Sequence, residues 1–197
     1  MRRLLLSGWL VLPIAGWAYH EGPGQDRLRM DEADAALRRA HAAAVAEDWA
    51  DSVAEYEAAL KVMPKSMEAE TRRARLELNK ARMLAKQLPT AHDELTALVE
   101  ELAADPRADA ALLAEARSTQ ANAQYYMTWL MRLEGQPRDK WEPEIEAARQ
   151  TYRLLAEQAE RSKDEAAGKR HREDLESSIR LARMELKDLQ GLPLPSQ

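Results

Sequence analysis

The feature of this sequence that most restricts its fold is the lack of glycine over its central part. The chain has seven glycines, and none occurs between Gly24 and Gly135. Glycine is the residue that most readily adopts the strained backbone conformations of tight turns. A β-rich fold would hardly manage over a hundred residues without it, whereas helices joined by short turns marked by Pro and Asp can. An all-α fold is therefore expected.

The apolar composition favours the same fold class. Phe is absent, and Ala and Leu dominate with Met as a filler; these residues favour helices over sheets. With 45% hydrophobic and 32% charged residues, the chain does not have the composition of a disordered protein. Its 197 residues fit one domain with a sizeable core.

Charge and cysteine content exclude several classes of protein. The formal net charge is −5 at pH 7, whereas a nucleic-acid-binding module would normally carry an excess of Lys and Arg. No nucleic-acid partner is expected. The chain has no Cys, which excludes disulfides, thiolate metal sites, cysteine nucleophiles and lipoprotein anchoring.

Residues 1–18 predict export from a bacterial cytoplasm. Arg2 and Arg3 precede a largely apolar run from Leu4 to Tyr19, which is typical of a secretory signal peptide cleaved after Ala18. The alternative is an uncleaved membrane anchor, which needs about 20 apolar residues. Either alternative places the body of the protein in the periplasm, free or anchored to the inner membrane. An anchored chain would associate with that membrane through residues 4–19.

Residues 31–190 are expected to form one helical domain, preceded by a linker at 19–30 and followed by a flexible tail at 191–197. Pro64 and Pro106 each follow a long helical pattern and begin a turn that leads into another helix. The segment from Ala36 to Pro64 predicts a helix, a tight turn at Glu47-Asp48 and a second helix that Asp48 can cap. Similar patterns predict about three hairpins in all.

The second helix of the first hairpin resembles that of a tetratricopeptide repeat (TPR). The matching residues are Asp48-Trp49, Ser52-Val53, Tyr56, Ala59-Leu60 and Pro64. The stretch Ala121-Asn122-Ala123-Gln124-Tyr125-Tyr126 is similar to part of the family's first helix. Ala36 and Arg39 depart from the pattern, and the later helices are longer than those of the usual 34-residue repeat. The resemblance implies a right-handed array of antiparallel hairpins whose first helices line a concave groove for peptides.

A last helix is expected to cap this array. Ser162 to Glu165 has the form of a capping box, and an apolar seam follows at Leu175, Ile179, Ala182, Leu186 and Leu189. Gly191, Pro193 and Pro195 would end the helix. The same narrow seam could instead form a coiled-coil dimer, but it is short for that purpose.

No catalytic, metal or cofactor site is expected. The four histidines stand in separate segments without a His-x-x-x-His or Glu-x-x-His pair. The sequence lacks a Gly-rich phosphate loop and a Gly-x-Ser-x-Gly turn. An enzyme is therefore not expected.

Two sets of residues are candidates for binding a protein partner. In the first, Ser118, Asn122, Tyr125 and Trp129 recur at helical spacing, and the TPR resemblance implies that Asn122 and Tyr125 face the groove. Exposed Tyr and Trp suit recognition. The alternative is that Tyr125 and Trp129 pack in the core, as aromatic stripes on helices commonly do.

The second set is a cationic line, Arg75, Arg82 and Lys86. If it faces the groove, it would favour an acidic peptide or a free carboxylate. The alternative is a solvated helix face, with positive charge placed favourably toward the helix C-terminus.

The expected function is a non-catalytic adaptor or scaffold of the cell envelope that binds another protein. One alternative is a structural subunit of a membrane-anchored envelope complex, which would use its outer helix faces. Another is a homodimeric helical bundle held together through Leu175 and Ile179.

Overall fold

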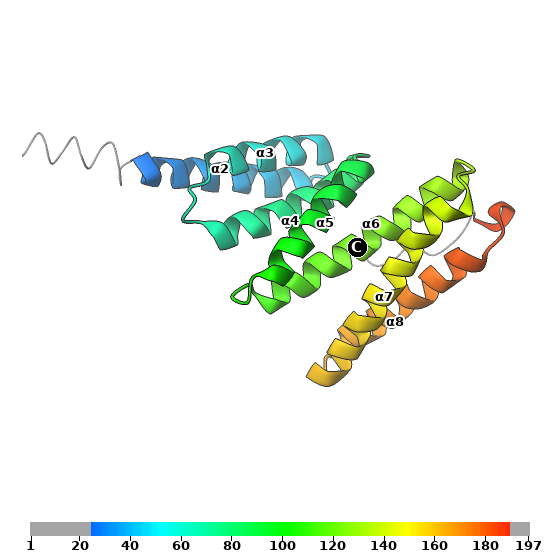
Figure 1. Cartoon of the computed structure of the whole chain (residues 1–197). Helices are drawn as coiled ribbons and strands as arrows, with labels where there is room; N and C mark the ends of the chain where they lie inside the picture. Colours follow the sequence, from blue (N-terminus) through cyan, green and yellow to red (C-terminus); the bar gives the residue numbers. More distant parts are fainter. Residues whose placement is uncertain (1–24, 190–197) are drawn as a thin grey trace, which may run out of the picture. The chain divides into compact units, whose positions relative to one another are not determined.

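The computed structural model describes residues 25–189, and every regular element within them is helical (Figure 1). The all-α expectation is confirmed for this part of the chain. The seven α-helices are α2 (Gln25–Val45), α3 (Trp49–Val62), α4 (Glu68–Leu84), α5 (Leu88–Ala104), α6 (Ala110–Leu133), α7 (Arg138–Ser162) and α8 (Glu165–Arg183). A 3₁₀ turn, η2 (Leu186–Asp188), follows.

The expected leader at 1–18 and tail at 191–197 lie outside the described residues. Helix α2 begins at Gln25, inside the stretch expected to be a linker. Within residues 25–189, no helix combines the length and the apolar content that a membrane crossing requires.

The chain divides into two compact units, and the division falls inside α4, between Ala74 and Arg75. In the first unit α2 packs against α3, with Ala33, Ala40 and Ala59 fully buried. The Asp48 carboxylate accepts a hydrogen bond from the Asp51 backbone N–H at 3.3 Å, which caps α3. The hairpin expected between residues 36 and 64 is thus confirmed.

In the second unit, α5 packs on α6, α6 on α7 and α7 on α8 (Figure 1). A leucine-rich core joins α4, α5 and α6, and its fully buried members include Leu76, Leu95 and Leu98. Burying each of these side chains contributes about 1.5–3 kcal/mol. This core is therefore a main source of stability for the unit.

A second core lies where α6, α7 and the end of α8 meet. It contains Tyr125, Ile145, Leu181 and Leu189, each no more than 2% exposed. The Arg132 guanidinium donates hydrogen bonds to the carbonyl oxygens of Leu181 and Met184. These contacts satisfy carbonyl groups at the end of α8, which an unassisted helix end would leave without partners.

The helix ends explain how the chain makes tight turns without glycine. After α2, α4, α6 and α7, one residue adopts a positive φ: Glu47 (59°), Lys86 (63°), Gly135 (72°) and Lys163 (59°). At each of these helix ends, the residue that follows the positive-φ residue donates a backbone N–H hydrogen bond to the carbonyl oxygen five residues before it. An example is Asp164 N–H to Ala159 O at 2.9 Å. This is the Schellman pattern, which normally uses glycine. Three of the four turns instead hold Glu or Lys in the left-handed conformation.

One helix start agrees with a general rule and another differs from the expectation. Helix α5 begins at Leu88 after Gln87, with Pro89 inside its first turn, where proline is well tolerated. The cap of α8 is Asp164, whose carboxylate accepts from the Ala167 N–H at 3.0 Å. The capping box expected at Ser162 is therefore wrong, because Ser162 ends α7 instead.

The seam expected on the last helix is also only partly right. Helix α8 ends at Arg183, and Leu186 in the following turn is 53% exposed. The buried face of α8 is built largely from small and polar residues, including Ser177 and Ser178. Leu181 is the large buried side chain of α8, and Leu189, which follows η2, is buried as well.

Candidate functional site

A polar cleft in the second unit is the first candidate site. It has a volume of about 380 Å³, and α4, α6 and α8 each contribute side chains to it. Helix α6 supplies residues on one face at helical spacing, since Ser118 and Asn122 are one turn apart. The lining residues are Lys80, Glu115, Ser118, Thr119, Asn122, Arg170 and His171.

Lys80 is fixed at one side of the cleft by two carboxylates. Its Nζ lies 2.6 Å from Glu115 Oε1 on α6 and 2.9 Å from Glu77 Oε1 on its own helix. Partial burial acts to lower the pKa of Lys80, but the hydrogen bonds with Glu115 and Glu77 outweigh it and raise the pKa. Lys80 is therefore an oriented ammonium group, and its charge is locally balanced.

The wall formed by α6 is held from behind by a buried hydrogen bond. The Tyr152 hydroxyl of α7 donates to Asn122 Oδ1 at 2.6 Å, and Tyr152 is fully buried while Asn122 is 6% exposed. Burial, with a further contribution from Asp174, raises the pKa of Tyr152, so the hydroxyl remains protonated. The Asn122 side chain, which also lines the cleft, is thereby held in place.

Helix α8 contributes two basic side chains to the cleft. Arg170 is exposed, and His171 is half-buried. Burial lowers the pKa of His171, partly opposed by the Asp174 carboxylate, so the ring is neutral at pH 7. Within the described residues, the buried Nδ1 of His171 has no hydrogen-bond partner. The ring thus lines the cleft while its Nδ1 is buried and unpaired beneath the surface.

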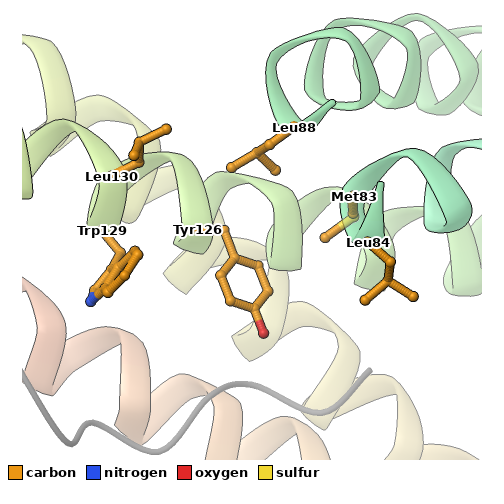
Figure 2. A pocket seen from close by; sticks show the side chains of 6 residues that line it. All are labelled: Met83, Leu84, Leu88, Tyr126, Trp129 and Leu130. Atoms are coloured by element: carbon orange, nitrogen blue, oxygen red, sulfur yellow. The ribbon is translucent and has the colours of Figure 1, made fainter. Parts of the chain in front are cut away.

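An apolar pocket of about 170 Å³ is the second candidate site. In Figure 2 the Tyr126 and Trp129 rings project side by side from α6, with side chains of α4 and α5 across from them. Both rings are half-buried, so part of each aromatic surface faces solvent. The lining residues are Met83, Leu84, Leu88, Tyr126, Trp129 and Leu130.

The structure separates the residues of the expected aromatic stripe. Ser118 and Asn122 lie in the polar cleft, and Trp129 lies in the apolar pocket. Tyr125 is fully buried in the core with Ile145 and Leu181, and burial raises its pKa to about 12. The core placement, one of the two alternatives for this residue, is thus the one observed.

The cationic line does not converge on either site. Arg75 pairs with Glu101 of α5, with Nη1 and Oε2 2.5 Å apart, and Arg82 donates to Asn79 Oδ1 at 3.2 Å. Lys86 is exposed in the left-handed turn after α4. None of the three is among the described residues that line the cleft or the pocket.

Sequence reasoning missed Lys80, Arg170 and His171 as members of one site. Each is an ordinary basic residue on a charged helix, and only the packing of α4 and α8 around α6 brings them together. Lys80 sits one turn after Glu77, a spacing that indicates an intrahelical ion pair and gives no hint of a cleft. Within residues 25–189, no cluster of three or more His, Asp or Glu side chains could hold a metal ion.

Chemically, the cleft combines hydrogen-bond donors and acceptors with an exposed guanidinium. The groups are the Asn122 amide, the Ser118 hydroxyl, the His171 ring and the Arg170 side chain. Such groups can exchange hydrogen bonds with a polar ligand, and the guanidinium can bind an anion. A search of protein-family models, of curated proteins and of solved structures found no match to this chain.

Proposed function

We propose that this protein is a non-catalytic adaptor that holds a partner polypeptide in the polar cleft of its second unit. The observation that carries the proposal is the convergence of Lys80, Asn122 and Arg170 from three different helices on one open cleft of about 380 Å³. A purely structural helix bundle has no need to keep such groups together.

The charges favour a partner segment that carries a carboxylate. Glu115 and Glu77 balance Lys80, whereas Arg170 is exposed at the cleft. A guanidinium binds a carboxylate through two parallel hydrogen bonds. The preferred ligand is therefore a peptide with an acidic side chain or its own C-terminal carboxylate near Arg170.

The finer architecture is proposed together with this function. In the second unit each of the later helices packs on the next along the chain, α5 on α6, α6 on α7 and α7 on α8. This sequential packing suits TPR-like hairpins, and the right-handed arrangement is proposed from the TPR resemblance of residues 48–64 and 121–126. The cell-envelope location is supported by the sequence of residues 1–18 alone.

A pull-down from native envelope extract tests the proposal. The charge reversal Arg170→Glu should reduce recovery of a specific partner about fivefold, which corresponds to about 1 kcal/mol of binding free energy. The neighbouring exposed Lys169→Glu makes the same change in net charge outside the lining of the cleft and should have little effect. Equal recovery with both variants would reject the cleft as the binding site.

One observation favours the second candidate, a structural subunit that uses outer helix faces. Helix α2 exposes three large apolar side chains, Leu28 (57%), Met30 (38%) and Val45 (72%). In that case Leu28→Ser with Val45→Ser should release the chain from its complex, and Arg170→Glu should not. The two sets of variants therefore distinguish the two candidates.

A further inference from the structure

The histidine of the polar cleft has one ring nitrogen that a ligand can reach. His171 lines the cleft to which α4, α6 and α8 contribute. Its Nδ1 is buried without a hydrogen-bond partner among the described residues, whereas Nε2 is not one of the buried unpaired atoms. When the ring is protonated, both nitrogens carry a hydrogen. A ligand in the cleft therefore meets a potential hydrogen-bond donor at Nε2.

Groups on its own helix decide whether the His171 ring is charged in the free protein. Burial lowers the pKa of His171, and the positive charge of Arg170 also acts to lower it. The negative charges of Asp174 on α8 and of the capping residue Asp164 oppose this lowering only in part. The free cleft therefore holds a neutral His171 next to a charged Arg170.

The other helices around the cleft supply no unbalanced charge. Lys80 of α4 is paired with Glu115 of α6 at 2.6 Å and with a second carboxylate on its own helix. Helix α7, which packs on both α6 and α8, contributes the Tyr152 hydroxyl behind the cleft. Burial raises the pKa of Tyr152, so this group is uncharged. A negative charge entering the cleft therefore acts mainly on the two basic side chains of α8.

We propose that the cleft binds the carboxylate of its partner peptide together with a proton, which His171 takes up, so that binding strengthens as the pH falls below 7. This inference rests on the proposed function and adds a regulation of the same site. A carboxylate bound by Arg170 cancels the positive charge that acts on His171 and places an acceptor near the ring. Both changes favour the imidazolium. The coupling is reciprocal, so the protonated cleft binds the carboxylate more tightly by the same factor.

The expected size of the effect follows from this reciprocity. A coupling of about fivefold, at the low end of the usual range, raises the pKa of His171 by about 0.7 in the complex. Since the pKa in the free protein is below the ordinary value of 6.5, the gain in affinity develops between about pH 7 and pH 5.5 and is absent at pH 8. A peptide carboxylate, with an ordinary pKa of about 4, stays ionised over this range.

A titration of the full-length chain with the acidic dipeptide N-acetyl-glutamyl-glutamate measures both sides of the coupling. The affinity, followed by NMR chemical shifts, should be about three- to fivefold higher at pH 5.5 than at pH 8. In the same samples, ¹⁵N signals of the histidine rings should show that the dipeptide raises the pKa of His171. The neutral control N-acetyl-glutaminyl-glutamine should bind weakly and without dependence on pH.

Two variants assign the proton to one ring. His171→Gln keeps an N–H donor and removes the titration, so the affinities at the two pH values should become equal. The control His41→Gln removes an exposed histidine of α2 outside the lining of the cleft and should keep the wild-type ratio. If His171→Gln does not fold, the ring titration of the wild-type chain decides, with His171 assigned through its backbone signals.

Several results would overturn the inference. They are equal affinities of the wild-type chain at both pH values, a pKa of His171 that the dipeptide leaves unchanged, an unchanged affinity ratio in His171→Gln, or no binding of the dipeptide at all. The proposed function is judged separately, by the pull-down with Arg170→Glu and Lys169→Glu at one pH. A partner lost with Arg170→Glu, together with binding that ignores pH, would keep the adaptor and reject the coupled proton.

Discussion

The hydrogen bond behind the polar cleft makes a quantitative prediction. Tyr152→Phe removes only the hydroxyl that donates to Asn122 Oδ1 at 2.6 Å and keeps the packing of the ring. Because Tyr152 is fully buried, water cannot replace the lost donor, and Asn122 Oδ1 loses this bond. The loss should cost about 1–2 kcal/mol of unfolding free energy.

A loss of this size should lower the melting temperature by roughly 2–8 °C, at about 2–4 °C per kcal/mol for a chain of this length. The assay is urea denaturation followed by circular dichroism at 222 nm, with a thermal melt beside it. Asn122→Ala and the double variant complete a double-mutant cycle, whose coupling energy should be about 1 kcal/mol. A Tyr152→Phe variant within about 0.3 kcal/mol of the wild type would refute the reasoning, since no buried bond of normal strength would then exist.

Three further changes test other parts of the structure. Leu98→Ala removes a fully buried side chain and should cost about 2–5 kcal/mol in urea denaturation; a cost below about 1 kcal/mol would contradict its place in the core. Lys163→Gly relieves a left-handed backbone at φ 59° and should stabilise the protein by up to about 1 kcal/mol, whereas Lys169→Gly in the interior of α8 should destabilise it by about 1 kcal/mol. The hydrogen bond of His92 Nε2 with Glu144, 2.9 Å long, raises the pKa of His92 despite its partial burial. A raised folded-state pKa adds stability that is complete below the unfolded value of about 6.5 and is lost as pH rises through the folded value. The stability difference between wild type and His92→Gln should therefore be larger at pH 5.5 than at pH 9, and a difference that grows with pH would contradict the assignment.

The helices of both units show what the sequence could and could not predict about the fold. The proline after the first hairpin and the capping residue Asp48 are local signals that predict where helices end and begin. The structure places the first hairpin where these signals indicate. The lack of glycine correctly predicted helices. It did not predict that Glu47, Lys86 and Lys163 would adopt positive φ, because Schellman hydrogen bonds at the helix ends outweigh the steric cost for these residues.

The candidate sites were less predictable, for a geometric reason. The four-three-four spacing of Ser118, Asn122, Tyr125 and Trp129 correctly indicates a common side of α6. That helix contacts different neighbours along its 24 residues, so one stripe passes from the polar cleft to the core and then to the apolar pocket. Lys80 and Arg170 are 90 residues apart in sequence, and periodicity within one helix carries no information about which distant helix lies opposite.

The measurement that tests the central proposal most directly is photo-cross-linking from inside the cleft. A photoreactive amino acid replaces Arg170 in the full chain, and the neighbouring exposed Lys169 is replaced in a second preparation as the control. In native envelope extract, we expect position 170 to give one defined protein adduct that an excess of an acidic peptide suppresses, and position 169 to give little of it. Equal adducts from both positions, or no adduct from position 170 under conditions in which the partner co-purifies, would contradict the account.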